Sequence, residues 1–99
     1  MKKITLKKLL QLNNPIIYDI RNKEEYNKYH IKNSINISFD IIYISYSTIL
    51  NTFDTYYIVC EEGFRSKKLV KHISKKGYNV IYVKHGLINR KKYLNMFDF

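Results

Sequence analysis

Apolar runs recur along the chain at intervals that predict a series of short strands. Residues 16–20 are apolar except at Asp19, as expected of a strand that is covered on both faces. Residues 56–60 and 79–84 form two further runs, and residues 34–37 show the alternating character of a shorter strand. Stretches with helical signals lie between these runs. The alternation predicts an α/β fold with a mainly parallel central sheet of four to five strands and helices on both faces.

Helices are expected in the gaps: a small one after Thr5, one turn near 24–26, and longer ones over 39–50, 66–76 and 87–97. The segment 39–50 is rich in β-branched residues that would also suit a strand, so only its place in the alternation indicates a helix, with Ser38 as a possible N-cap. Gly77 is suited to end the helix over 66–76. The last helix offers four side chains for packing, namely Leu87, Tyr93, Leu94 and Phe97.

Residues 60–66, Cys-Glu-Glu-Gly-Phe-Arg-Ser, join a predicted strand to a predicted helix and carry the candidate chemistry. A loop that ends at a helix start presents backbone N–H groups without partners, and their dipoles favour an anion beside Cys60. A thiolate or an anionic substrate is therefore favoured there, and Arg65 adds a fixed cation. Gly63 allows a tight turn, and Ser66 is a suitable helix cap. A lone cysteine in this position also suits simple packing, but its neighbours favour chemistry.

Composition limits the remaining possibilities. The 99 residues suffice for one domain, and 45% of them are apolar without a run near the roughly 18 residues that a membrane span requires. The single cysteine excludes an internal disulfide, and with three scattered histidines it does not build a zinc site. The basic start lacks the apolar segment of a secretion signal, so a cytoplasmic protein is expected, as a monomer or weak dimer.

The net charge of +10 raises the question of nucleic-acid binding. All but three of the 18 basic residues are lysines, and they are spread over the whole chain rather than gathered in one stripe. Lys, Ile, Asn and Tyr are abundant, as an AT-rich genome favours. A solvated lysine surface accounts for the charge, so no nucleic-acid partner and no membrane contact are expected.

Three separated motifs follow one another: Tyr18-Asp19-Ile20-Arg21 with Glu25-Tyr26, then His30-Ile31-Lys32-Asn33-Ser34-Ile35-Asn36-Ile37, and then the stretch 60–66. In that order they resemble the Asp-x-Arg…Glu-Tyr, Gly-His-Ile-Pro-Gly-Ala-x-Asn and Cys-x-x-Gly-x-Arg-Ser motifs of the rhodanese-like domains, in particular the small single-domain sulfurtransferases of bacteria. The resemblance extends from Ile4 to about Gly86, and its loop motif is the most specific part. Residues 1–99 are accordingly expected to form a single rhodanese-like domain.

This resemblance implies a sulfurtransferase in which Cys60 attacks the outer sulfur of a donor and holds it as a persulfide. The donor would be thiosulfate or a small-molecule or protein persulfide, and the acceptor would be a thiol or another thiophile. Arg65 would act with Cys60 in catalysis. Five further residues would bind the substrate, namely Glu61, Glu62, Gly63, Phe64 and Ser66. The implied chemistry requires neither a metal nor an organic cofactor.

Other polar residues are expected to support the site. Asp19 and Arg21 are expected to pair at a strand end beneath it, and His30 to be a structural histidine. His72 and His85 are expected at the surface or in turns. The chain also departs from the family pattern: Tyr29, Lys32, Asn33 and Ser34 stand where Gly, Pro, Gly and Ala are usual, His85 replaces the first glycine of a pair, and Arg90 or a neighbour stands where many members have a tryptophan.

Sulfur transfer has alternatives. Rhodanese-like domains also serve as non-catalytic regulatory or docking modules, although those often lack the cysteine that this chain retains. Phosphatases and arsenate reductases on the same scaffold have five residues between cysteine and arginine, whereas four separate Cys60 from Arg65, which favours sulfur. A thiol oxidoreductase is disfavoured because the chain has no second, resolving cysteine.

Two carboxylates follow Cys60 directly, on Glu61 and Glu62. Their charges would oppose both the formation of a thiolate and the approach of doubly charged thiosulfate. Thiosulfate is therefore expected to be a poor donor, and a persulfide on a small thiol or a partner protein a better one. The alternative is that both side chains point into solvent.

Overall fold

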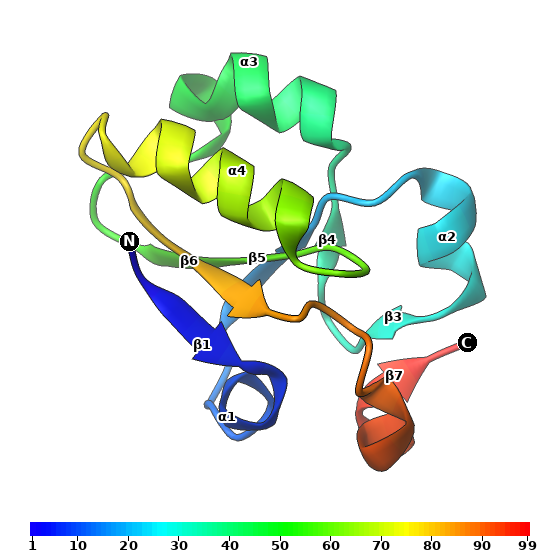
Figure 1. Ribbon diagram of the computed structural model, residues 1–99. Coiled ribbons are helices and arrows are strands. Elements are labelled where there is room, and N and C mark those ends of the chain that lie inside the picture. Colours follow the sequence, from blue (N-terminus) through cyan, green and yellow to red (C-terminus); the bar gives the residue numbers. More distant parts are fainter.

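A five-stranded sheet in which all neighbouring strands are parallel forms the centre of the computed structural model, which describes residues 1–99 (Figure 1). The strands lie in the order β1 (Lys3–Thr5), β6 (Asn79–Lys84), β5 (Thr55–Val59), β2 (Ile16–Asp19) and β4 (Ile35–Asn36). β5 therefore occupies the middle of the sheet, where Ile58 and Val59 are fully buried. The prediction of a mainly parallel sheet of four to five strands is confirmed.

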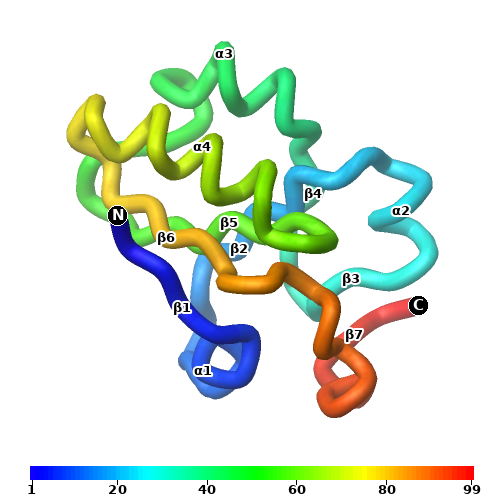
Figure 2. The backbone as a smooth tube through the Cα atoms, in the orientation of Figure 1, coloured from blue at the N-terminus to red at the C-terminus, as the bar shows by residue number.

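Helices lie on both faces of this sheet, as predicted. They are α1 (Leu6–Leu10), α3 (Phe39–Ile49) and α4 (Phe64–Ser74), while the short helix α2 (Lys23–Lys28) has no buried residue. α3 and α4 lie side by side over one face, and α1 lies on the other (Figures 1 and 2). Each face has its own core, because Ile42 and Leu69 belong to one cluster of buried residues and Leu9 belongs to a second. No helix is both long and apolar enough to cross a bilayer.

The start of α1 agrees with the prediction from the sequence, whereas the start of α4 differs from it. Thr5 caps α1, since its hydroxyl accepts a hydrogen bond from the backbone N–H three residues later (3.2 Å). α4 begins at Phe64, two residues earlier than expected, so Ser66 lies in its first turn and is not its cap. Gly63 occupies the N-cap position with a φ of 95°. This left-handed conformation, which favours glycine, lets the chain enter the helix ahead of its apolar stripe.

The predicted helix over residues 87–97 is wrong. A 3₁₀ helix, η1 (Arg90–Met96), occupies most of this segment, and the backbone of Tyr93 leaves helical values within it (φ −135°, ψ 31°). The chain then forms β7 (Phe97–Asp98), which pairs antiparallel with β3 (His30–Ile31) in a small second sheet. This pairing joins segments far apart in the sequence, so no local apolar pattern could indicate it.

Phe97 secures the C-terminal segment, because its side chain is 3% exposed and packs in the same core as Leu87. We expect Phe97→Ala to lower the free energy of unfolding by about 3 kcal/mol or more, since a buried aromatic ring is lost and a cavity remains. Phe99→Ala is the matched control, because Phe99 is 73% exposed and its loss should change stability by less than about 0.5 kcal/mol. Urea unfolding followed by circular dichroism measures both values. Equal effects would contradict the packing of β7 described here.

Candidate active site

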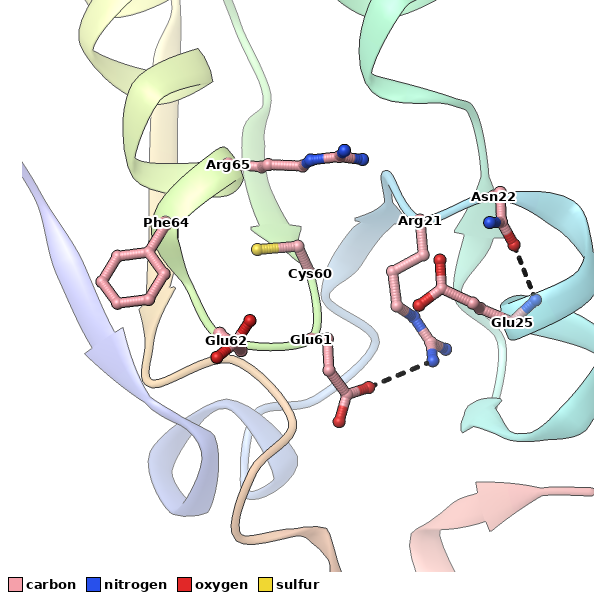
Figure 3. Close-up of a pocket in the computed structure, with 8 residues that line it drawn as sticks. All are labelled: Arg21, Asn22, Glu25, Cys60, Glu61, Glu62, Phe64 and Arg65. Atoms are coloured by element: carbon pink, nitrogen blue, oxygen red, sulfur yellow. Dashed lines mark hydrogen bonds and ion pairs between the residues drawn. The ribbon is translucent and has the colours of Figure 1, made fainter.

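Cys60 lies directly after β5, at the carboxyl end of the central strand and before the start of α4. A pocket of about 410 Å³ opens beside it (Figure 3). Eight residues line this pocket: Arg21, Asn22, Glu25, Cys60, Glu61, Glu62, Phe64 and Arg65. Sites in parallel sheets lie outside the carboxyl ends of the strands, and this pocket has that position. Apart from Gly63 and Ser66, all of the residues predicted in the stretch 60–66 line it.

The sulfur of Cys60 is surrounded by hydrogen-bond donors. Its Sγ accepts hydrogen bonds from the backbone N–H groups of Gly63 (3.2 Å) and Ser66 (3.4 Å). Ser66 Oγ lies 3.3 Å from the same sulfur and donates to the carbonyl oxygen of Gly63 (3.1 Å). Because these donors belong to the loop and the first turn of α4, the sulfur sits at the positive end of the helix dipole. The environment favours negative charge on the sulfur.

Further backbone donors in the loop are free. The N–H groups of Glu61, Glu62, Phe64 and Arg65 donate no hydrogen bond within the protein. The first N–H groups of any helix lack partners inside it, and a loop of consecutive N–H groups can bind an anion. The loop therefore combines a buried cysteine with several donors that an anionic group could use.

Two glycines allow the loop to take this shape. Gly63 has the left-handed backbone described above. Gly86, with a φ of 54°, lies against the loop so closely that a Cβ there would be 2.2 Å from the carbonyl oxygen of Cys60 and 2.5 Å from that of Glu61. The next residue, Leu87, donates its N–H to the carbonyl oxygen of Glu61 (2.8 Å). The turn after β6 thus packs directly against the backbone of the loop at Cys60 and Glu61.

Asp19 and Arg21 form the expected pair at the end of β2. Arg21 donates to Asp19 through Nη2 (2.9 Å), Nε (3.0 Å) and its backbone N–H (3.0 Å), and both residues are buried. Burial by itself lowers the pKa of Arg21, but the hydrogen bonds and the charge of Asp19 outweigh it and raise this pKa above its ordinary value. Arg21 also donates to the carbonyl oxygen of Tyr29 (2.7 Å). The arginine therefore joins β2 to the segment that leads into β3.

Glu61 points away from the sulfur of Cys60 and toward Arg21 (Figure 3). Its carboxylate accepts hydrogen bonds from Tyr29 Oη (2.6 Å) and Arg90 Nη1 (2.7 Å), and Arg21 Nη1 lies 3.5 Å away. The negative charge of Glu61, which was expected to oppose a thiolate at Cys60, is paired with two guanidinium groups. Glu62 is exposed and forms no ion pair, so it matches the alternative of a solvated side chain.

Arg65 lies in the first turn of α4 with an exposed side chain that makes no hydrogen bond or ion pair. Its guanidinium extends over the pocket toward Asn22 (Figure 3). Phe64 lies on the opposite side of the loop from Arg65 and is 75% exposed. The pocket thus has an unpaired cation at its edge.

The histidines do not line this pocket. His30 stacks on Tyr26 with ring centroids 3.8 Å apart, and its Nδ1 lies 2.7 Å from the carbonyl oxygen of Tyr26. His72 stacks on Tyr43 (4.0 Å), and His85 takes a positive φ of 65° in the turn after β6. The stacking of His30 fits a structural role and His85 is exposed in its turn, whereas His72 is half-buried against Tyr43.

Two residues of the site were missed by the sequence reasoning, Tyr29 and Arg90. Both reach Glu61, although they lie 32 and 29 residues from it along the chain. The available signal was that Tyr29 and Arg90 depart from the pattern of the motifs described above. That signal marks a position as unusual without indicating what the side chain contacts.

Comparison with known proteins identifies the class to which this fold and site belong. Residues 3–89 match the rhodanese-like domain, and the chain therefore belongs to the rhodanese-like family. Over 87 residues it is 30% identical to the adenylyltransferase and sulfurtransferase uba4 of Ogataea parapolymorpha. That match covers 87% of this chain and 22% of the other protein, so the chain spans about a fifth of the length of its curated relative. The present chain is thus a rhodanese-like domain that is homologous to sulfurtransferase domains.

Solved structures of small rhodanese-like proteins have the same fold. A protein from Staphylococcus saprophyticus is 29% identical, with a TM-score of 0.81 over 90% of this chain and 92% of that one. The rhodanese-like domain protein from Staphylococcus aureus is 34% identical, with a TM-score of 0.76 over 88% of each chain. A structure described as rhodanese with anions from E. coli is 26% identical, with a TM-score of 0.63 over 74% of this chain and 87% of that one.

Proposed function

We propose that this protein is a sulfurtransferase that carries a sulfane sulfur as a persulfide on Cys60. The observation that carries the proposal is the environment of Cys60 Sγ, which accepts hydrogen bonds from two backbone N–H groups at the start of α4. Such donors favour the thiolate that attacks sulfur, and they are fixed before the reaction begins. The homology to sulfurtransferase domains supports the same reaction class.

The reaction has two displacement steps. In the first, the Cys60 thiolate attacks the outer sulfur of the donor, so that a bond forms between the two sulfurs. The bond from that outer sulfur to the rest of the donor breaks, and sulfite leaves from thiosulfate or a thiolate leaves from a persulfide. In the second, an acceptor thiolate attacks the outer sulfur of the Cys60 persulfide and releases the Cys60 thiolate. Each step exchanges one bond to sulfur for another and needs no further oxidant or reductant.

The residues around Cys60 have distinct roles in this proposal. The free N–H groups of the loop would stabilise the negative charge on the persulfide, together with those of Gly63 and Ser66. Arg65, which is unpaired at the edge of the pocket, would attract the anionic end of a donor. The pair of Asp19 and Arg21 would hold the floor of the site without contacting the reacting atoms.

Mass spectrometry tests the proposal directly. Reduced protein is mixed with thiosulfate, and separately with a small-molecule persulfide, and the peptide that contains Cys60 is weighed. We expect this peptide to gain the mass of one sulfur atom from at least one donor, and the Cys60→Ala variant to gain nothing. Because Cys60 is the single cysteine of the chain, no other thiol can account for the gain.

Loss of the added mass on incubation with a thiol acceptor would complete the cycle. If the folded protein gained no sulfur from either donor, the proposal would be wrong. A non-catalytic docking module would then be the better description of the domain.

A further inference from the structure

Two departures from the family pattern contact each other in this structure. Tyr29 directly precedes β3, and Arg90 is the first residue of η1. The guanidinium carbon of Arg90 lies 4.1 Å from the centroid of the Tyr29 ring, and that of Arg21 lies 4.7 Å from it. Both distances suit cation–π stacking. The tyrosine ring is therefore in contact with two arginines.

These side chains converge on one carboxylate of the active-site loop. Glu61 Oε1 accepts from Tyr29 Oη, and Glu61 Oε2 accepts from Arg90 Nη1, as described above. Arg90 is itself fixed by a second hydrogen bond to the carbonyl oxygen of Leu87 (3.1 Å). We call Tyr29, Arg21, Arg90 and Glu61 the Glu61 cluster. With Asp19 included, its two carboxylates and two guanidinium groups sum to zero charge.

The contacts of the Glu61 cluster are partly shielded from water. Their electrostatic interactions are therefore stronger than those of fully exposed ion pairs. The side chains of Glu61 and Arg90 are 32% and 27% exposed, and that of Arg21 is 2% exposed. Burial raises the pKa of Tyr29, and the hydrogen bond to Glu61 raises it further. Its phenol therefore keeps its proton at neutral pH and remains a donor to the carboxylate.

We propose that Tyr29 and Arg90 are positioning residues that hold the Glu61 carboxylate away from Cys60 and neutralise it, so that the pocket admits anionic sulfur donors. Three carboxylates line the pocket, those of Glu25, Glu61 and Glu62, and Arg65 is its unpaired cation. Without its partners, the Glu61 carboxylate would leave its negative charge unneutralised in this pocket. The expected admission of anionic sulfur donors rests on the proposed function. The expected change in electrostatic potential at Cys60 does not depend on it.

The charge of the reagent that attacks Cys60 provides a test that does not depend on sulfur transfer. Iodoacetate is an anion and iodoacetamide is neutral, and both alkylate a thiolate, so the ratio of their rates reports the potential at the sulfur. Cys60 is the single cysteine of the chain, so the reaction has one site. We expect Arg90→Gln to lower the ratio of the iodoacetate rate to the iodoacetamide rate by about three- to tenfold at low ionic strength. Added salt should reduce the effect.

Three further variants separate electrostatics from packing. Glu61→Gln in the Arg90→Gln background returns the cluster, counted together with Asp19, to zero net charge and should restore the ratio to within about twofold of the original. Arg90→Lys keeps the positive charge, so its ratio of the iodoacetate rate to the iodoacetamide rate should stay close to that of the original protein. Lys91→Gln removes an exposed positive charge from the next residue and is the matched control, with little expected change.

With thiosulfate as the donor, Arg90→Gln should raise KM several-fold, by about the same factor as the alkylation ratio falls, and leave kcat nearly unchanged. An unchanged alkylation ratio in Arg90→Gln would overturn the inference. A fall of both alkylation rates by the same factor is such an unchanged ratio. A double variant whose ratio stays as low as that of Arg90→Gln would also overturn the inference. If the original protein takes up no sulfur, the proposed function fails, and the alkylation ratio still decides whether the Glu61 cluster controls the charge at Cys60.

Discussion

Gly86→Ala is expected to lower the rate of sulfur loading on Cys60 by at least about 100-fold, because displacements near 1 Å at a reacting centre have effects of this size. The added Cβ would lie 2.2 Å and 2.5 Å from two backbone oxygens of the loop, and backbone atoms cannot rotate away as a flexible side chain can. The loop must therefore move, and with it the N–H groups that surround the sulfur.

Gly77→Ala is the matched control for this change. Gly77 also has a positive φ, 91°, but a Cβ at this position would meet no atom within 4 Å. The substitution should lower the free energy of unfolding by about 1–2 kcal/mol through backbone strain and leave sulfur loading intact. Mass spectrometry measures the rate of sulfur loading for both variants. The two rates are compared at a temperature at which both variants are folded. Equal loading by the two variants would show that Gly86 does not determine the shape of the loop.

Asp19→Ala is expected to lower the free energy of unfolding by about 3–5 kcal/mol, because it leaves the guanidinium of Arg21 buried without its carboxylate. Asp19 is 0% exposed and accepts several hydrogen bonds from Arg21. Urea unfolding followed by circular dichroism measures the change. Asp40→Asn is the matched control, since Asp40 is exposed and forms no ion pair, and it should cost less than about 1 kcal/mol.

A double variant identifies the cause of this loss. Asp19→Leu combined with Arg21→Met removes both charges, and a buried pair replaced by apolar residues is often tolerated. The double variant should therefore be more stable than Asp19→Ala, although it loses the contact from Arg21 to the carbonyl oxygen of Tyr29. A double variant that is less stable than Asp19→Ala would mean that the lost contacts, rather than an uncompensated charge, cause the destabilisation.

Sequence reasoning succeeded where a structural element depends on neighbouring residues. The apolar run at 56–60 and the stripe of Leu69, Val70 and Ile73 each predict an element from local periodicity, and β5 and α4 are present at those places. The segment 39–50 was predicted as a helix from its place in the alternation, against its β-branched composition, and α3 is a helix. The parallel arrangement of the strands was predicted because strands that alternate with helices are joined by crossover connections.

It failed where a contact joins distant parts of the chain. β7 pairs with β3 across more than 60 residues, and the helix expected over 87–97 is replaced by the 3₁₀ helix η1 and this strand. The charge effect expected of Glu61 was inferred from its neighbour Cys60 alone. Its actual partners, Tyr29, Arg21 and Arg90, come from other parts of the chain, and the two guanidinium groups neutralise that charge.

The sequence by itself determined the class of fold, the place of the cysteine at the end of a central strand, and the family to which the chain belongs. These properties depend on periodicity and on motifs of adjacent residues, which a linear chain carries directly. The tertiary structure alone decided the close contact of Gly86 with the loop, the start of α4 at Phe64 and the pairing of Glu61 with two arginines. Each depends on the direction of a side chain or the approach of two backbones, which are set only when the whole core has packed.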